Sequence, residues 1–210
     1  MNIVVFGAGG RAGRQAVAEA HRRGHRVTAV VRDPAGHSEL TGLTDVRVMA
    51  GDVTDPASVE RTAAAHDAAI SAAADLSVPP HEFFTTSSRA LASGLAKAGV
   101  HRLVVVGLSS VLPGASGALL MDEPGYPNEY RSFSLGHAAG LDELRRCDLD
   151  WAYVAPAGDF DHAGTRTGRY RIAEHGDPAD RITYADLAVA LIDEIEEPRR
   201  HRTAVSVREA

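Results

Sequence analysis

Residues 2–13 read Asn-Ile-Val-Val-Phe-Gly-Ala-Gly-Gly-Arg-Ala-Gly. Residues 3–6 form an unbroken apolar run rich in β-branched side chains, which is typical of a parallel strand buried on both faces. Glycines follow at Gly7, Gly9, Gly10 and Gly13, and a helical pattern begins at Ala12. The glycines let the backbone pass close to a pyrophosphate, and a helix N-terminus presents unpaired N–H groups with partial positive charge. This stretch therefore predicts a dinucleotide site.

The spacing within the loop supports that prediction. The pattern Gly7-x-Gly9-x-x-Ala12 nearly matches the dinucleotide fingerprint, and Gly7-x-x-Gly10-x-x-Gly13 matches a variant of it. We therefore expect the loop residues to contact the cofactor: Gly7, Gly9, Gly10, Arg11, Ala12 and Gly13. The alternative is a glycine loop that only makes a tight turn.

Strand and helix patterns alternate along the rest of the chain. Strands are predicted at 27–31, 46–49, 67–71, 102–107, 151–154 and 203–207, and helices at 12–23, 56–65, 82–98, 133–146 and 184–195. Asp55 is the expected N-cap of the second helix, and Pro56 lies in its first turn. The alternation predicts an α/β fold of Rossmann type: a doubly wound parallel sheet with helices on both faces.

We expect one domain over residues 1–210, with substrate-side elements at roughly 108–135 and 157–180. Residues 108–130 carry three prolines and three glycines without periodicity, which indicates a long loop. In a compact domain such a loop more often covers a site than merely connects two elements. The carboxyl ends of the parallel strands should face the same ligand.

The composition limits which binding partners and which cellular compartment we expect for this protein. A net charge of −6 gives no electrostatic case for nucleic acid, and no apolar run reaches membrane-spanning length. The single cysteine, Cys147, has no partner for an intramolecular disulfide. The ten histidines show no metal-ligand spacing, so no metal is expected. We expect a cytoplasmic protein whose partner is a small-molecule substrate.

The end of the second strand should select between cofactors, because the adenosine ribose is bound there. A free 2′-hydroxyl favours a carboxylate, whereas a 2′-phosphate favours a cation. Arg32 and Asp33 offer both, and Arg11 can approach the same place. The planar guanidinium suits phosphate, so NADP (as NADPH) is favoured over NAD. The alternative is that Arg32 is a solvated surface residue and that Asp33 caps a turn.

Two further strand ends carry candidate contacts. Asp52 and Val53 follow the third strand, where they could flank adenine or simply form a turn before the helix cap. Ser71, Ala72 and Ala73 end the fourth strand and are small enough for close approach of a cofactor.

Matching stretches are spread along nearly the whole chain: 7–13, 31–34, 51–53, 102–107, 149–151, 166–170 and 182–188. In these the chain resembles the atypical short-chain dehydrogenase/reductases with an NAD(P)H-binding fold, which include NmrA-like proteins and biliverdin-IXβ (flavin) reductase. The resemblance implies that the following residues line the cofactor: Gly10, Arg11, Ala12, Arg32, Asp52, Val53, Ser71, Ala72, Ala73 and Pro156.

The chain departs from ordinary short-chain dehydrogenases at the catalytic pair. It has one lysine, Lys97, and no Tyr-x-x-x-Lys motif. The resemblance places His137 where many NmrA-like relatives carry a lysine, and Ser109 where a hydroxyl would face the nicotinamide. Tyr130, at the end of the long loop, is the third catalytic candidate. His137 could donate a proton near neutral pH, or it could be a partly exposed helix residue.

Two functions from different classes follow from the resemblance. One is an NADPH-dependent reductase that transfers hydride to a flavin-like, quinone-like or small carbonyl acceptor. The other is a non-catalytic NADP(H)-sensing regulatory protein of NmrA type, whose bound state is detected by a protein partner.

Overall fold

A mostly parallel sheet runs through the middle of the computed structural model, which describes residues 1–173 and 175–210. Within these residues, eight strands pair in the order β3-β2-β1-β4-β5-β6-β10-β8. Their bounds are β1 Asn2–Phe6, β2 Arg26–Val31, β3 Val46–Ala50, β4 Ala68–Ser71, β5 Arg102–Val106, β6 Asp150–Pro156, β8 Arg171–Ala173 and β10 Thr203–Arg208. All pairs are parallel except β8 with β10. The order reverses between β1 and β4, which places a ligand crevice there.

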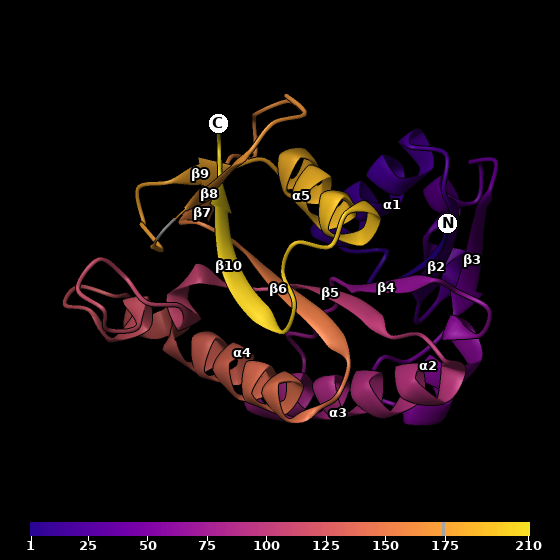
Figure 1. Ribbon diagram of the computed structural model, residues 1–210, viewed down its shortest axis with the longest axis horizontal. Coiled ribbons are helices and arrows are strands. Elements are labelled where there is room, and N and C mark those ends of the chain that lie inside the picture. Colours follow the sequence, from indigo (N-terminus) through magenta and orange to yellow (C-terminus); the bar gives the residue numbers. More distant parts are fainter. Residues whose placement is uncertain (174) are drawn as a thin grey trace.

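Helices cover both faces of the sheet (Figure 1). One face packs against α1 (Arg11–Arg22) and α5 (Tyr184–Glu196), and the other against α2 (Pro56–Ala63), α3 (Pro80–Ala98) and α4 (Asn128–Arg146). Alternate residues of β1 supply the two apolar cores: Ile3 and Val5 belong to one, Val4 and Phe6 to the other. The predicted α/β doubly wound fold is therefore confirmed.

The start of α2 agrees with its sequence. The Asp55 carboxylate accepts hydrogen bonds from the backbone N–H groups of Ala57, at 3.0 Å, and Ser58, at 3.2 Å. Pro56 occupies the first turn, where a missing N–H costs nothing.

The long loop is shorter than the sequence predicts. Helix α4 begins at Asn128, with Pro127 at its N-cap, five residues before the predicted start at 133. Short 3₁₀ turns occupy Ser109–Val111 and Leu120–Asp122. The sequence also missed β8 and a small pair of strands, β7 (Asp159–Phe160) and β9 (Arg181–Ile182). These strands are two or three residues long, too short for a periodic signal.

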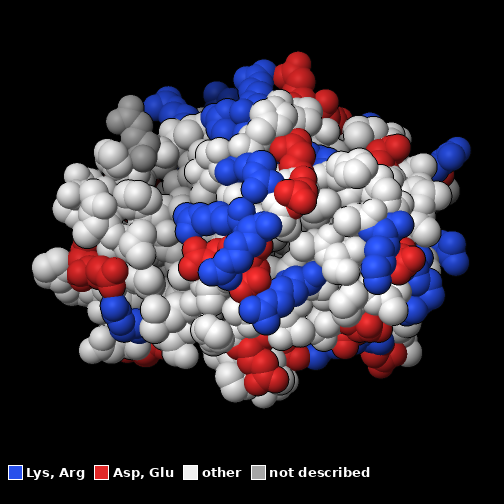
Figure 2. Space-filling view, turned by 60° about the horizontal axis from the view of Figure 1, so that its bottom comes forward, with Lys and Arg blue, Asp and Glu red and all other residues white. Residues whose placement is uncertain are grey.

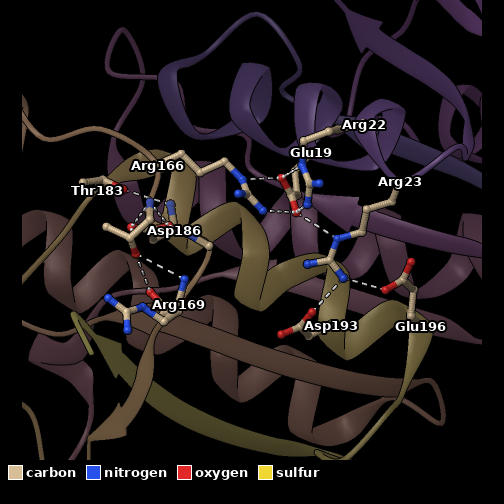
Figure 3. Close-up of polar contacts among 11 residues, drawn as sticks. Glu19, Arg22, Arg23, Arg166, Arg169, Thr183, Asp186, Asp193 and Glu196 are labelled. Carbon is tan, nitrogen blue, oxygen red and sulfur yellow. Dashed lines mark hydrogen bonds and ion pairs between the residues drawn. The ribbon is translucent and has the colours of Figure 1, made fainter.

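The segment between β7 and β8 is held to α1 and α5 by buried charge (Figure 3). Arg166 donates from Nε to Glu19 on α1 at 2.9 Å. Burial alone would raise the pKa of Glu19, but hydrogen bonds from Arg22, Arg166 and Arg23 lower it well below its usual range. This carboxylate is therefore ionised and joins segments far apart in the sequence.

Asp186 anchors the same segment from α5 (Figure 3). Its carboxylate accepts from the backbone N–H of Thr167 at 2.9 Å and of Gly168 at 2.8 Å, and it is 1% exposed. Thr183 caps α5 by accepting from the Asp186 N–H at 2.9 Å.

The outer surface in Figure 2 carries basic and acidic side chains side by side. Ion pairs on the exposed faces of α3 and α4 follow this pattern: Arg89 with Glu143 at 2.9 Å, and Arg145 with Asp142 at 2.7 Å.

Candidate functional site

A cavity of about 830 Å³ lies at the carboxyl ends of the central strands. The exits of β2 and β3 contribute Arg32 and Asp52 to its wall, and the exit of β5 contributes Gly107 and Leu108. Strand order places these two groups on opposite sides of β1 and β4. The cavity therefore spans the crevice in which Rossmann folds hold an extended dinucleotide.

Two glycines of the first loop are required by the fold itself. Gly7 has φ +74°, and a Cβ there would lie 2.6 Å from the backbone of Ala73. A Cβ on Gly13 would lie 2.1 Å from the carbonyl oxygen of Gly7. Only glycine lets the turn, α1 and the exit of β4 approach this closely.

Gly10 has a different environment. A Cβ there would meet protein only at van der Waals distance, 3.4 Å from the Gly7 oxygen, and the residue lines the cavity. Gly10 is the N-cap of α1, where no side chain caps the helix and the first turn has no acidic residue. The space above Gly10 and the uncapped helix terminus together fit a pyrophosphate.

Basic side chains gather at the β2 end of the cavity. Arg11, Arg32 and His37 all line it. The Arg32 side chain is 70% exposed and forms an ion pair with Asp75, which follows β4. Hydrogen bonds from Ser77, together with Arg32, lower the pKa of Asp75. Asp33 caps a 3₁₀ turn by accepting from the Ala35 N–H at 3.0 Å, the alternative that the sequence left open.

Asp52 has a local bonding role beside the cavity. Its carboxylate accepts from the N–H of Thr54 at 2.8 Å and from the Thr54 hydroxyl at 2.7 Å. The Asp52 N–H donates to the Ser58 hydroxyl at 2.9 Å, which ties the β3 exit to α2.

Most of the residues expected at the cofactor line the cavity: Gly7, Gly9, Gly10, Arg11, Ala12, Arg32, Asp52, Val53, Ala72 and Ala73. Three of those expected do not. Gly13 packs under the loop against Gly7. Ser71 is buried in β4 beside a separate void of about 20 Å³. Pro156 is buried at the end of β6, beside Val207 of β10.

Of the three catalytic candidates, only His137 lines the cavity. Ser109 is buried in the 3₁₀ turn after β5 and does not reach the cavity wall. Helix α4 starts earlier than the sequence predicts, so Tyr130 lies on its first turn and not in the loop. There its side chain is 57% exposed. The structure therefore does not bring the three side chains together.

His137 is buried among aromatic rings. Its centroid lies 3.8 Å from that of Phe84 and 4.9 Å from that of Phe133. Desolvation by these neighbours lowers the pKa of His137 to about 3. At neutral pH the ring is uncharged: it can donate one hydrogen bond but carries no additional proton to transfer. This differs from the expected role as proton donor near pH 7.

Aromatic side chains that the sequence analysis missed complete the cavity wall. They are Phe83 of α3, Phe133 of α4, Phe160 of β7 and Tyr184 of α5. The rings of Phe160 and Tyr184 stack with centroids 3.7 Å apart and planes at 12°. In the sequence each of these aromatic residues looks like an ordinary core residue. The four come from separate elements, so no local pattern indicates that they line one cavity.

The described residues contain no group of three or more His, Cys, Asp or Glu side chains arranged to hold a metal ion. Among the helices of residues 1–173 and 175–210, none has both the length and the apolar character needed to cross a bilayer.

Relatives of known sequence and structure match this chain end to end. The Bacillus subtilis protein YwnB is 34% identical over 217 residues, with 99% of this chain and 98% of YwnB covered. A candidate exported protein from Burkholderia pseudomallei is 36% identical, with TM-score 0.85 and 99% of both chains covered. A candidate NADH-flavin reductase from Streptococcus pneumoniae is 30% identical, with TM-score 0.84 and 100% of both chains covered.

A family model described as NAD(P)H-binding matches residues 7–198, from the glycine loop to the end of α5. This range includes every cavity-lining residue except Phe6, which lies at the end of β1. The chain therefore belongs to the NAD(P)H-binding family of reductase-like Rossmann proteins.

Proposed function

We propose that this protein is an NADPH-dependent reductase whose acceptor is a flat conjugated ring of flavin or quinone type. The observation that carries the proposal is the set of four aromatic side chains that line the cavity, Phe83, Phe133, Phe160 and Tyr184. Aromatic faces stack on planar conjugated rings, and the cavity volume of about 830 Å³ lies within the range of small-molecule sites.

The glycine loop and the strand exits would hold the cofactor. Gly10, Arg11 and Ala12 would bind the pyrophosphate at the start of α1, and Arg32 would bind the 2′-phosphate. Ala72 and Ala73 would pack beneath the nicotinamide half. The bound cofactor supplies a hydride, and the protein orients the acceptor and excludes water.

A conjugated ring is favoured over a small carbonyl because the candidate side chains offer no acid at the cavity. Reduction of a carbonyl develops an alkoxide, which calls for a nearby acid. His137 is uncharged at neutral pH, and Ser109 and Tyr130 lie away from the cavity. A flavin or quinone spreads the negative charge over its ring system and takes its proton from solvent.

The first experiment follows NADPH oxidation at the nicotinamide absorbance band with FMN, FAD, a naphthoquinone and a small aldehyde. We expect turnover with a flavin or the quinone and little with the aldehyde. NADPH binding without oxidation by any of the acceptors would instead favour the sensing function.

A pair of variants tests whether the aromatic side chains of the cavity bind the acceptor. Phe133→Ala should raise the KM for the conjugated acceptor by about tenfold, the effect of losing a stacking contact of about 1 to 1.5 kcal/mol. Leu135→Ala is the matched control, since Leu135 lies on the same helix, 46% exposed and away from the cavity. Equal effects of the two changes would count against the stacking role.

A further inference from the structure

Tyr153 lies behind His137 and Leu108, at the end of the cavity where the acceptor would bind, and is 1% exposed. Its hydroxyl oxygen accepts a hydrogen bond from the backbone N–H of Leu108 at 3.0 Å. The same hydroxyl lies 3.1 Å from Nδ1 of His137. Tyr153 is on β6, Leu108 follows β5 and His137 is on α4, so one hydroxyl joins three elements around the site.

The direction of the second hydrogen bond follows from the need to give the buried phenol proton an acceptor. A phenol has one proton, and an N–H group can only donate. The Tyr153 oxygen accepts from Leu108, and among the contacts of the described residues His137 Nδ1 is the acceptor within reach of the phenol proton, which would otherwise be buried without a partner. Burial raises the pKa of Tyr153, so the phenol keeps this proton. Nδ1 of His137 is then the acceptor, and the proton of the neutral ring is on Nε2.

Tyr153 also shapes the exit of β5. A Cβ on Gly107 would lie 2.0 Å from Cε1 of Tyr153, so the ring packs directly against the Gly107 backbone. Gly107 and Leu108 both line the cavity. The tyrosine therefore supports the cavity wall from below while it fixes the histidine within that wall.

We propose that Tyr153 is a positioning residue that holds His137 in the Nε2–H tautomer, so that Nε2–H donates a hydrogen bond to an oxygen or nitrogen of the acceptor ring. The proposal rests on the reductase function proposed above. Tyr153 acts on the acceptor through His137, and it does not itself line the cavity. No proton is transferred by this arrangement, because its role is to orient the acceptor.

The first test needs no activity. In protein labelled with ¹⁵N-histidine, a two-dimensional spectrum that correlates ring nitrogens with ring protons identifies the protonated nitrogen of each histidine. Assignment of His137 comes from the spectrum of His137→Phe. We expect the Nε2–H form in the parent at pH 7 and a mixture of tautomers in Tyr153→Phe. An Nδ1–H form in the parent would overturn the proposal, whatever the outcome of the reductase assays.

The second test is kinetic. Tyr153→Phe keeps the ring against Gly107 and removes only the hydroxyl, so KM for the acceptor should rise about three- to tenfold, as expected for one lost hydrogen bond. The dissociation constant for NADPH should stay the same. Tyr126→Phe is the matched control: it removes a phenol hydroxyl bonded to Ser134 at 2.7 Å, and Tyr126 does not line the cavity.

A double variant separates positioning from simple support. In a His137→Phe background, Tyr153→Phe should change KM by less than twofold, because the residue through which it acts is gone. A full additional three- to tenfold effect in that background would show that Tyr153 acts independently of His137 and would overturn the proposal. Thermal unfolding of each variant checks that KM is measured on folded protein.

Discussion

Arg32 and Asp75 form an ion pair at the rim of the cavity, joining the exit of β2 to the segment after β4. Arg32 is the expected 2′-phosphate contact, and Asp75 is only 12% exposed at its side chain. The cation proposed to select NADPH is therefore partly neutralised by the protein before any cofactor binds. Substitutions at Arg32 and at Asp75 should therefore change the affinity for NADPH in opposite directions.

Arg32→Ala should weaken NADPH binding by about 1 to 3 kcal/mol, the loss typical of a charged hydrogen-bonded pair. NADH binding should change little, since NADH lacks the 2′-phosphate. Calorimetric titration of both cofactors measures the difference. Arg26→Ala is the matched control, because Arg26 is an exposed arginine at the opposite end of β2. Equal affinity of the parent for NADPH and NADH would contradict the assignment of Arg32.

Asp75→Asn should have the opposite effect and tighten NADPH binding by about two- to fivefold, the range of a surface ion pair. Asparagine can still accept the hydrogen bonds that Ser77 donates to the Asp75 Oδ1, so the local turn is preserved. The same titration serves as the measurement. Weaker NADPH binding in this variant would show that Asp75 supports the site rather than competing for Arg32.

Substitutions at two glycines of the first loop should affect different properties, cofactor binding in one case and folding in the other. Gly10→Val should abolish dinucleotide binding while the protein stays folded, because a Cβ there meets protein only at van der Waals distance and the residue lines the cavity. Gly13→Val should unfold or strongly destabilise the protein, since its Cβ would lie 2.1 Å from the Gly7 oxygen. Circular dichroism and NADPH titration of both variants test this. A folded Gly10→Val protein that still binds NADPH would remove Gly10 from the site.

Burial of His137 should make stability depend on pH. Its pKa is lowered to about 3 in the folded protein, against about 6.5 in an unfolded chain. Between these values the unfolded state binds more protons, so stability falls as the pH drops below 6.5. Between pH 8 and pH 5 this histidine should cost about 2 kcal/mol. Urea unfolding should therefore show a shallower pH dependence in His137→Phe, and an unchanged slope would contradict the buried neutral state.

Loss of the Asp186 carboxylate should destabilise the segment between β7 and β8. Asp186→Ala leaves the part-buried N–H groups of Thr167 and Gly168 without their acceptor, which should cost about 1 to 3 kcal/mol. Asp142→Ala, at an exposed position on α4, is the control. Chemical unfolding measures both. A change of less than about 0.5 kcal/mol in Asp186→Ala would show that the segment is held by other contacts.

Local patterns in the sequence were enough to predict the architecture. The apolar run before Gly7 predicts a buried strand, and the Asp55-Pro56 pair predicts where α2 begins. Such signals need only a few neighbouring residues, because strand burial and helix capping are local properties of the chain. The rule that parallel strands point their carboxyl ends at one ligand then located Gly10, Arg32 and Asp52 at a common cavity.

The acceptor end was decided by tertiary structure alone. Phe133 and Phe160 come from separate elements, and only the packing of α4 and β7 brings them to one cavity. The contact of Tyr153 with His137 depends on the register of β6 against β5 and on the angle of α4, neither of which leaves a trace in residue spacing. The sequence predicts Ser109 at the cavity, but the chain after β5 forms a 3₁₀ turn at Ser109–Val111 in which the Ser109 side chain is buried away from the cavity wall. Chain neighbours determine strands, caps and glycine turns, whereas side chains far apart in the sequence meet only through the packing of the whole molecule.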